Sequence, residues 1–382
     1  MSSHWVEIDL AALRDNIRAL RQLLDARKHI LAVVKSDAYG HGMVMVARTL
    51  HDQGVRFFGV AEVHEGVTLR QAGISGGIVV FLGAEKGSLP DVIRHGLQPV
   101  VFDREQLAEI SSCAVAAGAT IGVHLKVDTG MGRLGIFPHE VAGFLAFLRE
   151  KKGVYLAGVM SHCPLADLPD TSWSEEQNRL FAGILRSAKL SGGETCTAHI
   201  ANSAAMLHYA QMHWDMVRPG IALYGCRAAD DEWAGKALLK PVMSFKSKII
   251  QVKDVPAGFG ISYGHTHVTT RPSRLAILPI GYNDGYLRAL SNRAEVLVRG
   301  RRAPQRGRVC MNVTIVDVTD IPGVCPGDEV TLLGAQQGEQ ISAEEVAGWM
   351  GTINYEVLCL FGNSNKRIYL SDDCVVNENR ND

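Results

Sequence analysis

The sequence lacks the features that mark several large classes of protein. No uninterrupted apolar run approaches the roughly 20 residues that a bilayer-spanning helix needs, and residues 1–9 show neither the basic segment nor the apolar core of a signal peptide. We therefore expect a cytoplasmic protein without a membrane partner. The 39 Lys and Arg residues meet 40 Asp and Glu, a net charge of −1. Because no excess of positive charge is present to neutralise phosphates, we expect no nucleic-acid partner.

Signals for disulfides and metals are also sparse. The eight cysteines are scattered, and no two of them form a C-x-x-C pair. In a long chain without a secretion signal this usage indicates reduced and mostly buried thiols. His265 and His267 could form one side of a metal site, but no third ligand accompanies them. We expect no metal.

The first part of the chain has the pattern of an α/β barrel. With 382 residues, the chain is long enough for two domains. Between residues 29 and 225, β-branched runs alternate with segments of helical spacing, such as Arg104–Ala117 and Glu175–Leu190. Continuous apolar strands separated by helices predict a parallel sheet covered on both faces, here a (β/α)8 barrel over residues 10–235. The predicted strands are Ile30–Val34, Phe57–Val60, Ile78–Leu82, Pro99–Phe102, Ile121–Val127, Val154–Met160, Thr197–Ile200 and Met216–Leu223.

The second part has a different pattern. After about residue 235 helical periods nearly vanish, and short strands recur between Pro-Gly turns. This predicts a mainly antiparallel β domain over residues 236–382, which the strand within residues 1–9 could join. The predicted strands are Trp5–Ile8, Met243–Val252, Arg274–Pro279, Ala294–Val298, Asn312–Val318 and Glu329–Leu333.

Two segments at predicted strand ends carry chemistry. Lys35 closes the first barrel strand beside Tyr39-Gly-His-Gly, where barrel enzymes place catalytic groups and a desolvated amine can form a Schiff base. Arg218 follows the last barrel strand, and Gly220 and Ile221 could offer backbone N–H groups to a phosphate. Each segment also has a simpler interpretation. A lysine at a strand end can be an ordinary surface residue, and Pro-Gly can be an ordinary turn.

A set of seven motifs, in this order along the whole chain, closely resembles the bacterial alanine racemases. They are Lys35 with Tyr39-Gly-His-Gly, Asp128-Thr-Gly-Met-Gly-Arg133-Leu-Gly, His199-Ile-Ala-Asn-Ser203-Ala-Ala, Arg218-Pro-Gly-Ile-Ala-Leu-Tyr-Gly, Ser262-Tyr263-Gly, Gly281-Tyr282-Asn-Asp284-Gly-Tyr and Arg308-Val-Cys-Met311. The resemblance implies a homodimer that uses pyridoxal 5′-phosphate to interconvert L- and D-alanine, and D-alanine supply for peptidoglycan.

The resemblance also implies a role for each matching residue. Racemisation needs a proton carrier on each face of Cα, and these would be Lys35 and, from the partner subunit, Tyr263. His162 and Arg218 would link that tyrosine to the pyridine nitrogen, while Arg133 would hold the substrate carboxylate and the phenolic oxygen of the cofactor. The other cofactor contacts would be Tyr39, His199, Ser203, Gly220, Ile221 and Tyr355, and the other substrate contacts Met311 and Tyr282.

Lys126 matches a lysine that family members often carry as a carbamate, an anion that could orient Arg133. The alternative is an unmodified lysine paired with Asp128 or with a bound anion. Three departures from the family pattern stand out: Asn312 replaces aspartate, Ser36-Asp37 replaces Ala-Asn, and His265 replaces a frequent arginine.

Of three other functions, the sequence argues against two and leaves the third open. A non-catalytic carrier of the cofactor would lack the second domain with Tyr263 and Met311. A decarboxylase of the same plan would place an acidic residue, not Arg218, at the pyridine nitrogen. A racemase for serine, lysine or many amino acids differs only in a few pocket residues near Ile353 and Tyr355, and the bulk of that tyrosine favours a small side chain.

Overall fold

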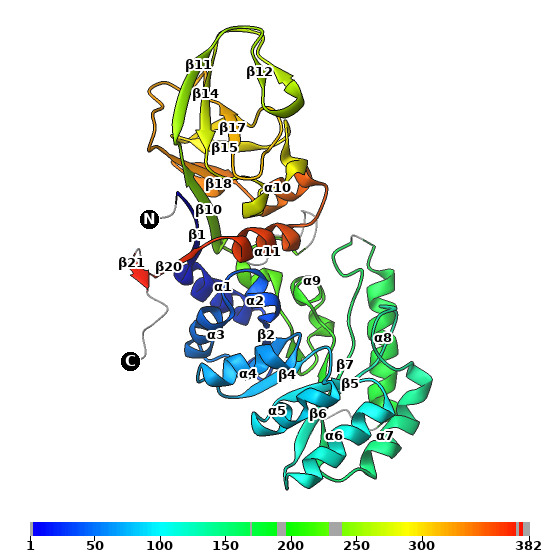
Figure 1. Cartoon of the computed structure of the whole chain (residues 1–382). Helices are drawn as coiled ribbons and strands as arrows, with labels where there is room; N and C mark the ends of the chain where they lie inside the picture. The colour runs from blue at the N-terminus through cyan, green and yellow to red at the C-terminus, as the bar shows by residue number, and fades with distance from the viewer. Residues whose placement is uncertain (1–2, 169, 189–195, 229–238, 372–373, 377–382) are drawn as a thin grey trace.

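The barrel is the larger part of the molecule. The computed structural model describes residues 3–168, 170–188, 196–228, 239–371 and 374–376. Within these ranges, eight parallel strands form one sheet that curls into a barrel beneath the β domain (Figure 1). In spatial order they are β8 (Thr197–His199), β7 (Val154–Met160), β6 (Ile121–Lys126), β5 (Gln98–Val101), β4 (Gly77–Val80), β3 (Phe57–Val60), β2 (His29–Val33) and β9 (Met216–Val217).

Hydrogen bonds around residue 215 close the barrel between β8 and β9. The backbone N–H of Asp215 donates to the Ala198 carbonyl at 3.1 Å, and that of Arg218 donates to the Ala201 carbonyl at 2.9 Å. The Asp215 carboxylate accepts from the Ala198 N–H at 2.8 Å. The predicted α/β barrel is therefore confirmed, with side-chain and main-chain bonds in place of a regular ladder at its seam.

Burial on both faces explains why most residues of the barrel strands are apolar. On β2, Leu31 and Val33 belong to the cluster inside the barrel, whereas Ile30 and Ala32 belong to the layer under the helices. Both faces of such a strand are buried, so both need apolar side chains. The surrounding helices are α1 (Leu10–Gln22), α3 (Met43–Asp52), α4 (Val63–Gln71), α5 (Leu89–Arg94), α6 (Arg104–Ala116), α7 (Val141–Arg149), α8 (Ser172–Ser187) and α9 (Ser203–His208).

Some predicted boundaries in the barrel are wrong or fall outside the described residues. The last strand was predicted over 216–223, but β9 ends at Val217, because Pro219 cannot donate to a ladder and Ile221–Tyr224 forms a 3-10 helix, η4. The predicted helix end at Leu190 and the domain boundary at 235–236 lie outside the described residues.

The C-terminal part is mainly antiparallel, as predicted. Its large sheet has the order β16-β15-β18-β10-β1-β20-β21, with β19 beside β18; the smaller sheets are β11-β14-β17 and β12-β13. The strands are β1 (His4–Asp9), β10 (Met243–Lys248), β11 (Gln251–Val255), β12 (Gly260–Ile261), β13 (His267–Val268), β14 (Ser273–Leu278), β15 (Glu295–Val298), β16 (Arg301–Pro304), β17 (Thr314–Asp317), β18 (Glu329–Gln336), β19 (Glu339–Ile341), β20 (Arg367–Ser371) and β21 (Cys374–Val376).

Two details of this part differ from the sequence prediction. The run 243–252 is not one strand, because β10 and β11 belong to different sheets. Two helices were also missed, α10 (Ala343–Met350) and α11 (Asn354–Ser364). The first carries a start signal, since the Ser342 hydroxyl accepts from the Glu345 N–H at 3.1 Å. Both helices lie between β19 and β20, in a segment for which the sequence analysis predicted no element.

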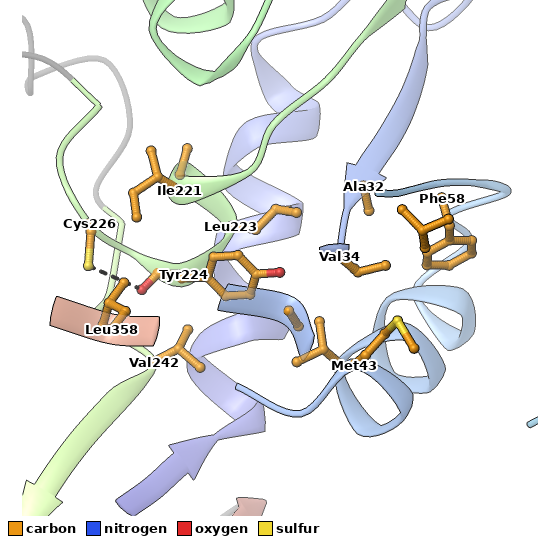
Figure 2. Close-up of a cluster of buried hydrophobic side chains, with 14 of the residues drawn as sticks. Ala32, Val34, Met43, Phe58, Ile221, Leu223, Tyr224, Cys226, Val242 and Leu358 are labelled. Atoms are coloured by element: carbon orange, nitrogen blue, oxygen red, sulfur yellow. Dashed lines mark hydrogen bonds between the residues drawn. The ribbon is translucent and has the colours of Figure 1, made fainter. Parts of the chain in front are cut away.

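Buried side chains from the barrel and from the C-terminal part of the chain pack into one cluster (Figure 2). Tyr224 of η4 lies between Leu358 of α11, Val242 before β10 and the residues after β2. Its hydroxyl donates to the Val33 carbonyl at 3.0 Å. This packing holds α11 next to the end of β2, close to Lys35. Across the described ranges, none of the helices combines the length and the hydrophobicity needed to cross a membrane.

Candidate active site

A cavity of about 1100 Å3 opens at the carboxyl ends of the barrel strands. This is the end at which barrel enzymes carry their chemistry. Ten residues predicted for the site line it: Lys35, Tyr39, Lys126, Arg133, His162, Ser203, Arg218, Gly220, Ile221 and Tyr355. His199 lies behind them, with Arg218 between it and the cavity. The predicted residues therefore converge from many strand ends on one space.

Lys35 begins a left-handed turn, α2 (Lys35–Tyr39). The φ angles of Ser36, Asp37, Ala38 and Tyr39 lie between 52° and 55°, a region that costs L-residues roughly 1–2 kcal/mol each. Such strain persists only where the surroundings over-determine the backbone. The turn replaces the simple strand end that the sequence suggested.

Side chains from three elements hold this turn. The Ser36 N–H donates to Glu65 Oε1 at 2.6 Å, and the Met43 N–H donates to Asp37 Oδ1 at 2.7 Å. Arg367 of β20 pairs with the other oxygen of Asp37 and donates to the Gly40 carbonyl at 3.2 Å. Asp37, one of the departures from the family pattern, thus connects the turn to the β domain.

The amine of Lys35 is prepared for chemistry. Burial, and next the nearby charge of Arg133, lower the pKa of Lys35. A lysine amine with a lowered pKa is present in its neutral, nucleophilic form at lower pH than a free lysine. Lys35 can therefore react with a carbonyl group in the cavity.

Arg218 is a buried cation without a carboxylate partner among the described residues. Its guanidinium donates to the carbonyls of Ser161 at 2.7 Å and Ile200 at 3.0 Å, and to Nδ1 of both His162, at 3.2 Å, and His199, at 3.1 Å. Burial lowers the pKa of Arg218 to about 10, so the charge persists at neutral pH. The site places a fixed positive charge where a pyridine nitrogen could face it.

The two histidines beside Arg218 are neutral. Burial, and next the charge of Arg218, hold the pKa of His162 and of His199 well below the usual range. Because a guanidinium only donates, Nδ1 of each ring accepts and the proton sits on Nε2. Nε2 of His162 is therefore a hydrogen-bond donor.

The far end of the cavity suits a phosphate. Ser203 Oγ accepts from the N–H groups of Gly220 at 2.9 Å and Ala222 at 3.3 Å, which fixes the loop before η4. A Cβ on Gly220 would lie 2.5 Å from the Tyr39 hydroxyl, so only glycine leaves this space open. The Tyr39 and Tyr355 rings pack 5.8 Å apart. The Tyr39 hydroxyl and the loop therefore meet in one part of the cavity, with the Tyr355 ring packed beside Tyr39.

Lys126 lines the same cavity as Arg133, close enough to feel its charge, and is 7% exposed. Burial, then the charges of Arg218 and Arg133, lower the pKa of Lys126 to about 7. The Asp128 carboxylate is occupied elsewhere, because it accepts from the four backbone N–H groups of residues 130–133 at 2.8–3.2 Å. These bonds shape the loop that presents Arg133, and they favour a role for Lys126 other than pairing with Asp128.

Three predicted site residues are not brought to this cavity. Tyr263, Met311 and Tyr282 are 70%, 54% and 40% exposed on the β domain. They do not line the cavity of their own chain among the described residues. The short hairpin of β12 and β13 flanks Tyr263, and Figure 1 places β12 in the half of the β domain away from the barrel.

Sequence reasoning missed two residues with a signal that was available. His124 precedes Lys126 by two positions on β6, so both point to the same side of the strand. Asn202 lines the cavity, caps α9 by accepting from the Ala205 N–H at 3.0 Å, and donates to the Cys163 carbonyl at 3.0 Å. An asparagine before a short helix is a typical N-cap.

Comparisons with known proteins agree along the chain. The family model described as "Alanine racemase, N-terminal domain" matches residues 8–228, and "Alanine racemase, C-terminal domain" matches residues 242–369. The alanine racemase of Syntrophobacter fumaroxidans is 48% identical over 95% of this chain and 96% of its own, and that of Halothermothrix orenii is 42% identical over 93% of each.

Solved structures agree as well. The alanine racemase of Clostridium difficile superposes with a TM-score of 0.92 at 33% identity, covering 99% of this chain and 98% of its own. The Bacillus anthracis alanine racemase with bound L-Ala-P gives a TM-score of 0.90 at 35% identity, covering 99% and 97%. From the two family matches and these full-length likenesses, the chain belongs to the alanine racemase family.

Proposed function

We propose that this protein is an isomerase that interconverts L-alanine and D-alanine with pyridoxal 5′-phosphate, as a homodimer whose two sites are shared. The observation that carries the proposal is that one cavity is lined both by Lys35, whose pKa is lowered, and by the buried cation of Arg218. We further propose that residues 10–235 bind the cofactor, and that residues 236–382, with the strand in 1–9, contribute to the partner's site.

The residues present fit this cofactor. Lys35 would supply an amine for its aldehyde, the hydroxyls of Ser203 and Tyr39 would donate to its phosphate, and Arg218 would lie at its ring nitrogen. Burial raises the pKa of Tyr39, so its hydroxyl stays protonated and can donate. When bound, pyridoxal phosphate withdraws electron density from the Cα of an amino acid and makes the Cα proton removable. A permanently protonated Arg218 limits that withdrawal, which favours return of the proton over transamination.

Proton transfer would use one group on each face of Cα. Lys35 Nζ takes or returns a proton on one face, and its lowered pKa brings the amine toward the range where it serves as a base. Tyr263 of the partner subunit would do the same on the other face. Tyrosine is a weak base near neutrality, and the Nε2–H of His162, backed by Arg218, is a donor suited to stabilise its oxyanion.

The substrate carboxylate would lie between Arg133 and the backbone N–H of Met311 of the partner subunit. A carbamate on Lys126 would add a fixed anion beneath Arg133 and hold its guanidinium in place. Support for the carbamate comes from the pKa of about 7, since only a neutral amine reacts with carbon dioxide. Tyr282 of the partner subunit would complete the substrate pocket.

Incubation with single L-amino acids in heavy water tests the proposal. Alanine should exchange its α-proton and lose optical activity, only in the presence of pyridoxal phosphate. Borohydride treatment of the yellow holoenzyme should attach the cofactor to the peptide containing Lys35. No exchange with alanine, or a label on Lys126, would overturn the assignment.

A further inference from the structure

A line of hydrogen bonds leaves Arg218 on the side away from the cavity and runs through the barrel interior. His199, which accepts from Arg218 through Nδ1, has its Nε2 2.9 Å from His124 Nδ1. His124 Nε2 lies 3.2 Å from Gln98 Oε1. The two rings are 2% exposed or less and stand edge to face, with centroids 5.1 Å apart. The line ends at the first residue of β5, at the amino end of the barrel strands.

Because Arg218 can only donate, the direction of each bond in this line can be inferred from it. Arg218 can only donate, so His199 Nδ1 is unprotonated and its proton sits on Nε2. That proton points to His124 Nδ1, which must then accept, so the proton of His124 also sits on Nε2 and points to Gln98 Oε1. Burial and then the charge of Arg218 hold the pKa of both histidines well below the usual range, in agreement with two neutral rings.

The barrel is shaped to receive the His124 ring. A Cβ on Gly158 of β7 would lie 2.3 Å from His124 Nδ1, so a glycine is required opposite the imidazole. The register between β6 and β7 also shifts between Val123 and His124. The backbone of two neighbouring strands is thus adapted to a buried polar ring at this layer.

We propose that His124 and Gln98 are positioning residues of the racemisation centre: they fix the tautomer of His199, and so keep its Nδ1 lone pair on Arg218. The proposal rests on the proposed function, in which Arg218 faces the pyridine nitrogen. If His199 Nδ1 carries a proton, it cannot accept from Nη1 of Arg218. The guanidinium then keeps only the hydrogen bonds that Nη2 makes. It could then turn away from the cavity.

The tautomers can be measured directly on the holoenzyme. Solid-state NMR of protein labelled with 15N in the histidine rings separates protonated from unprotonated ring nitrogens, and His124→Asn and His199→Asn variants assign the signals. We expect Nε2–H with a bare Nδ1 on both rings. In Gln98→Met, where the last acceptor is gone, the His124 signal should change. A proton on Nδ1 of His199, or an imidazolium at either ring, would overturn the proposal.

Kinetics test whether the tautomer matters. His124→Leu removes the acceptor for His199, whereas the amide oxygen of His124→Asn can take the place of Nδ1. We expect kcat for alanine to fall roughly 10–100-fold in the leucine variant, the range typical for partners behind a site residue. Most of the lost kcat should return in the asparagine variant, and KM should change little. The leucine variant should also release more pyruvate per racemisation event, because a displaced Arg218 no longer restrains transamination.

His213→Leu is the matched control, because His213 is a buried histidine that bonds only a carbonyl, that of Met206 at 2.8 Å, among the described residues. It should lose stability without a change in pyruvate release. Equal kcat and pyruvate release in the leucine and asparagine variants of His124, both folded, would overturn the proposal. An unmutated protein that does not racemise alanine would refute the proposed function alone, whereas reversed tautomers in an active enzyme would refute the positioning role alone.

Discussion

Mixing two inactive variants tests whether each site is built from two chains. Lys35→Ala removes the amine in the cavity. Tyr263→Phe removes the hydroxyl of a residue that is 70% exposed and does not line the cavity among the described residues of its own chain. Each variant alone should be nearly inactive in racemisation. We expect subunit exchange between them to restore activity, because a mixed dimer brings an intact Lys35 to an intact Tyr263.

The size of the recovery follows from two-fold symmetry. Random exchange of equal amounts makes about half of the dimers mixed. In a mixed dimer one site combines both substitutions and the other combines neither, so one of its two sites is intact. The mixture should therefore reach about one quarter of the activity of the unmutated protein per chain. If Tyr263 served its own subunit, every site would carry one substitution and no activity would return.

The assay is polarimetry or coupled oxidation of D-alanine, after exchange at low protein concentration or joint refolding. Differently tagged chains show how much mixed dimer has formed. As a control, a chain with both substitutions is mixed with the unmutated protein; it should lower that protein's activity by about half. Recovery far below one quarter, with mixed dimers demonstrated, would refute the shared site.

Three further predictions concern single residues. Lys126→Ala should lose most activity and regain part of it with small carboxylates. Because the pKa of Lys126 is about 7, the carbamate in the unmutated protein should form above that pH and be lost below it. 13C NMR with labelled bicarbonate measures this, and an unlabelled lysine at pH 8 would contradict it. Tyr355→Ala should raise kcat/KM for serine and lysine relative to alanine, each methylene being worth about 1–3 kcal/mol, and should weaken cofactor binding; equal use of lysine and alanine by the unmutated protein would contradict the preference for a small substrate. Arg367→Met and Asp37→Asn should each lower the free energy of unfolding by up to about 1 kcal/mol, as loss of a half-exposed ion pair does. Asp37→Ala should lower it by about 1 kcal/mol more, because it also removes the acceptor for the Met43 N–H. Equal urea midpoints for the three variants would show that this acceptor is unimportant.

Local pattern was enough to predict the fold class and the family of this chain. Burial on both faces makes most barrel-strand residues apolar, and that signal is readable in β2 or β4 without any tertiary information. The motifs around Lys35 and Arg218 were readable for the same reason, since each lies within a few consecutive residues. Element boundaries were predicted less well where Pro219 or a short connection ended a strand.

Long-range contacts decided the rest. The left-handed turn at Lys35 exists because Glu65 and Arg367, far away in the sequence, hold it. The bond between His124 and His199 joins residues 75 positions apart, and it forms only because barrel closure brings β6, β7 and β8 together. Local sequence fixes which residues can be strand or helix, whereas hydrogen-bond partners, burial and therefore pKa depend on where closure of the barrel places each side chain.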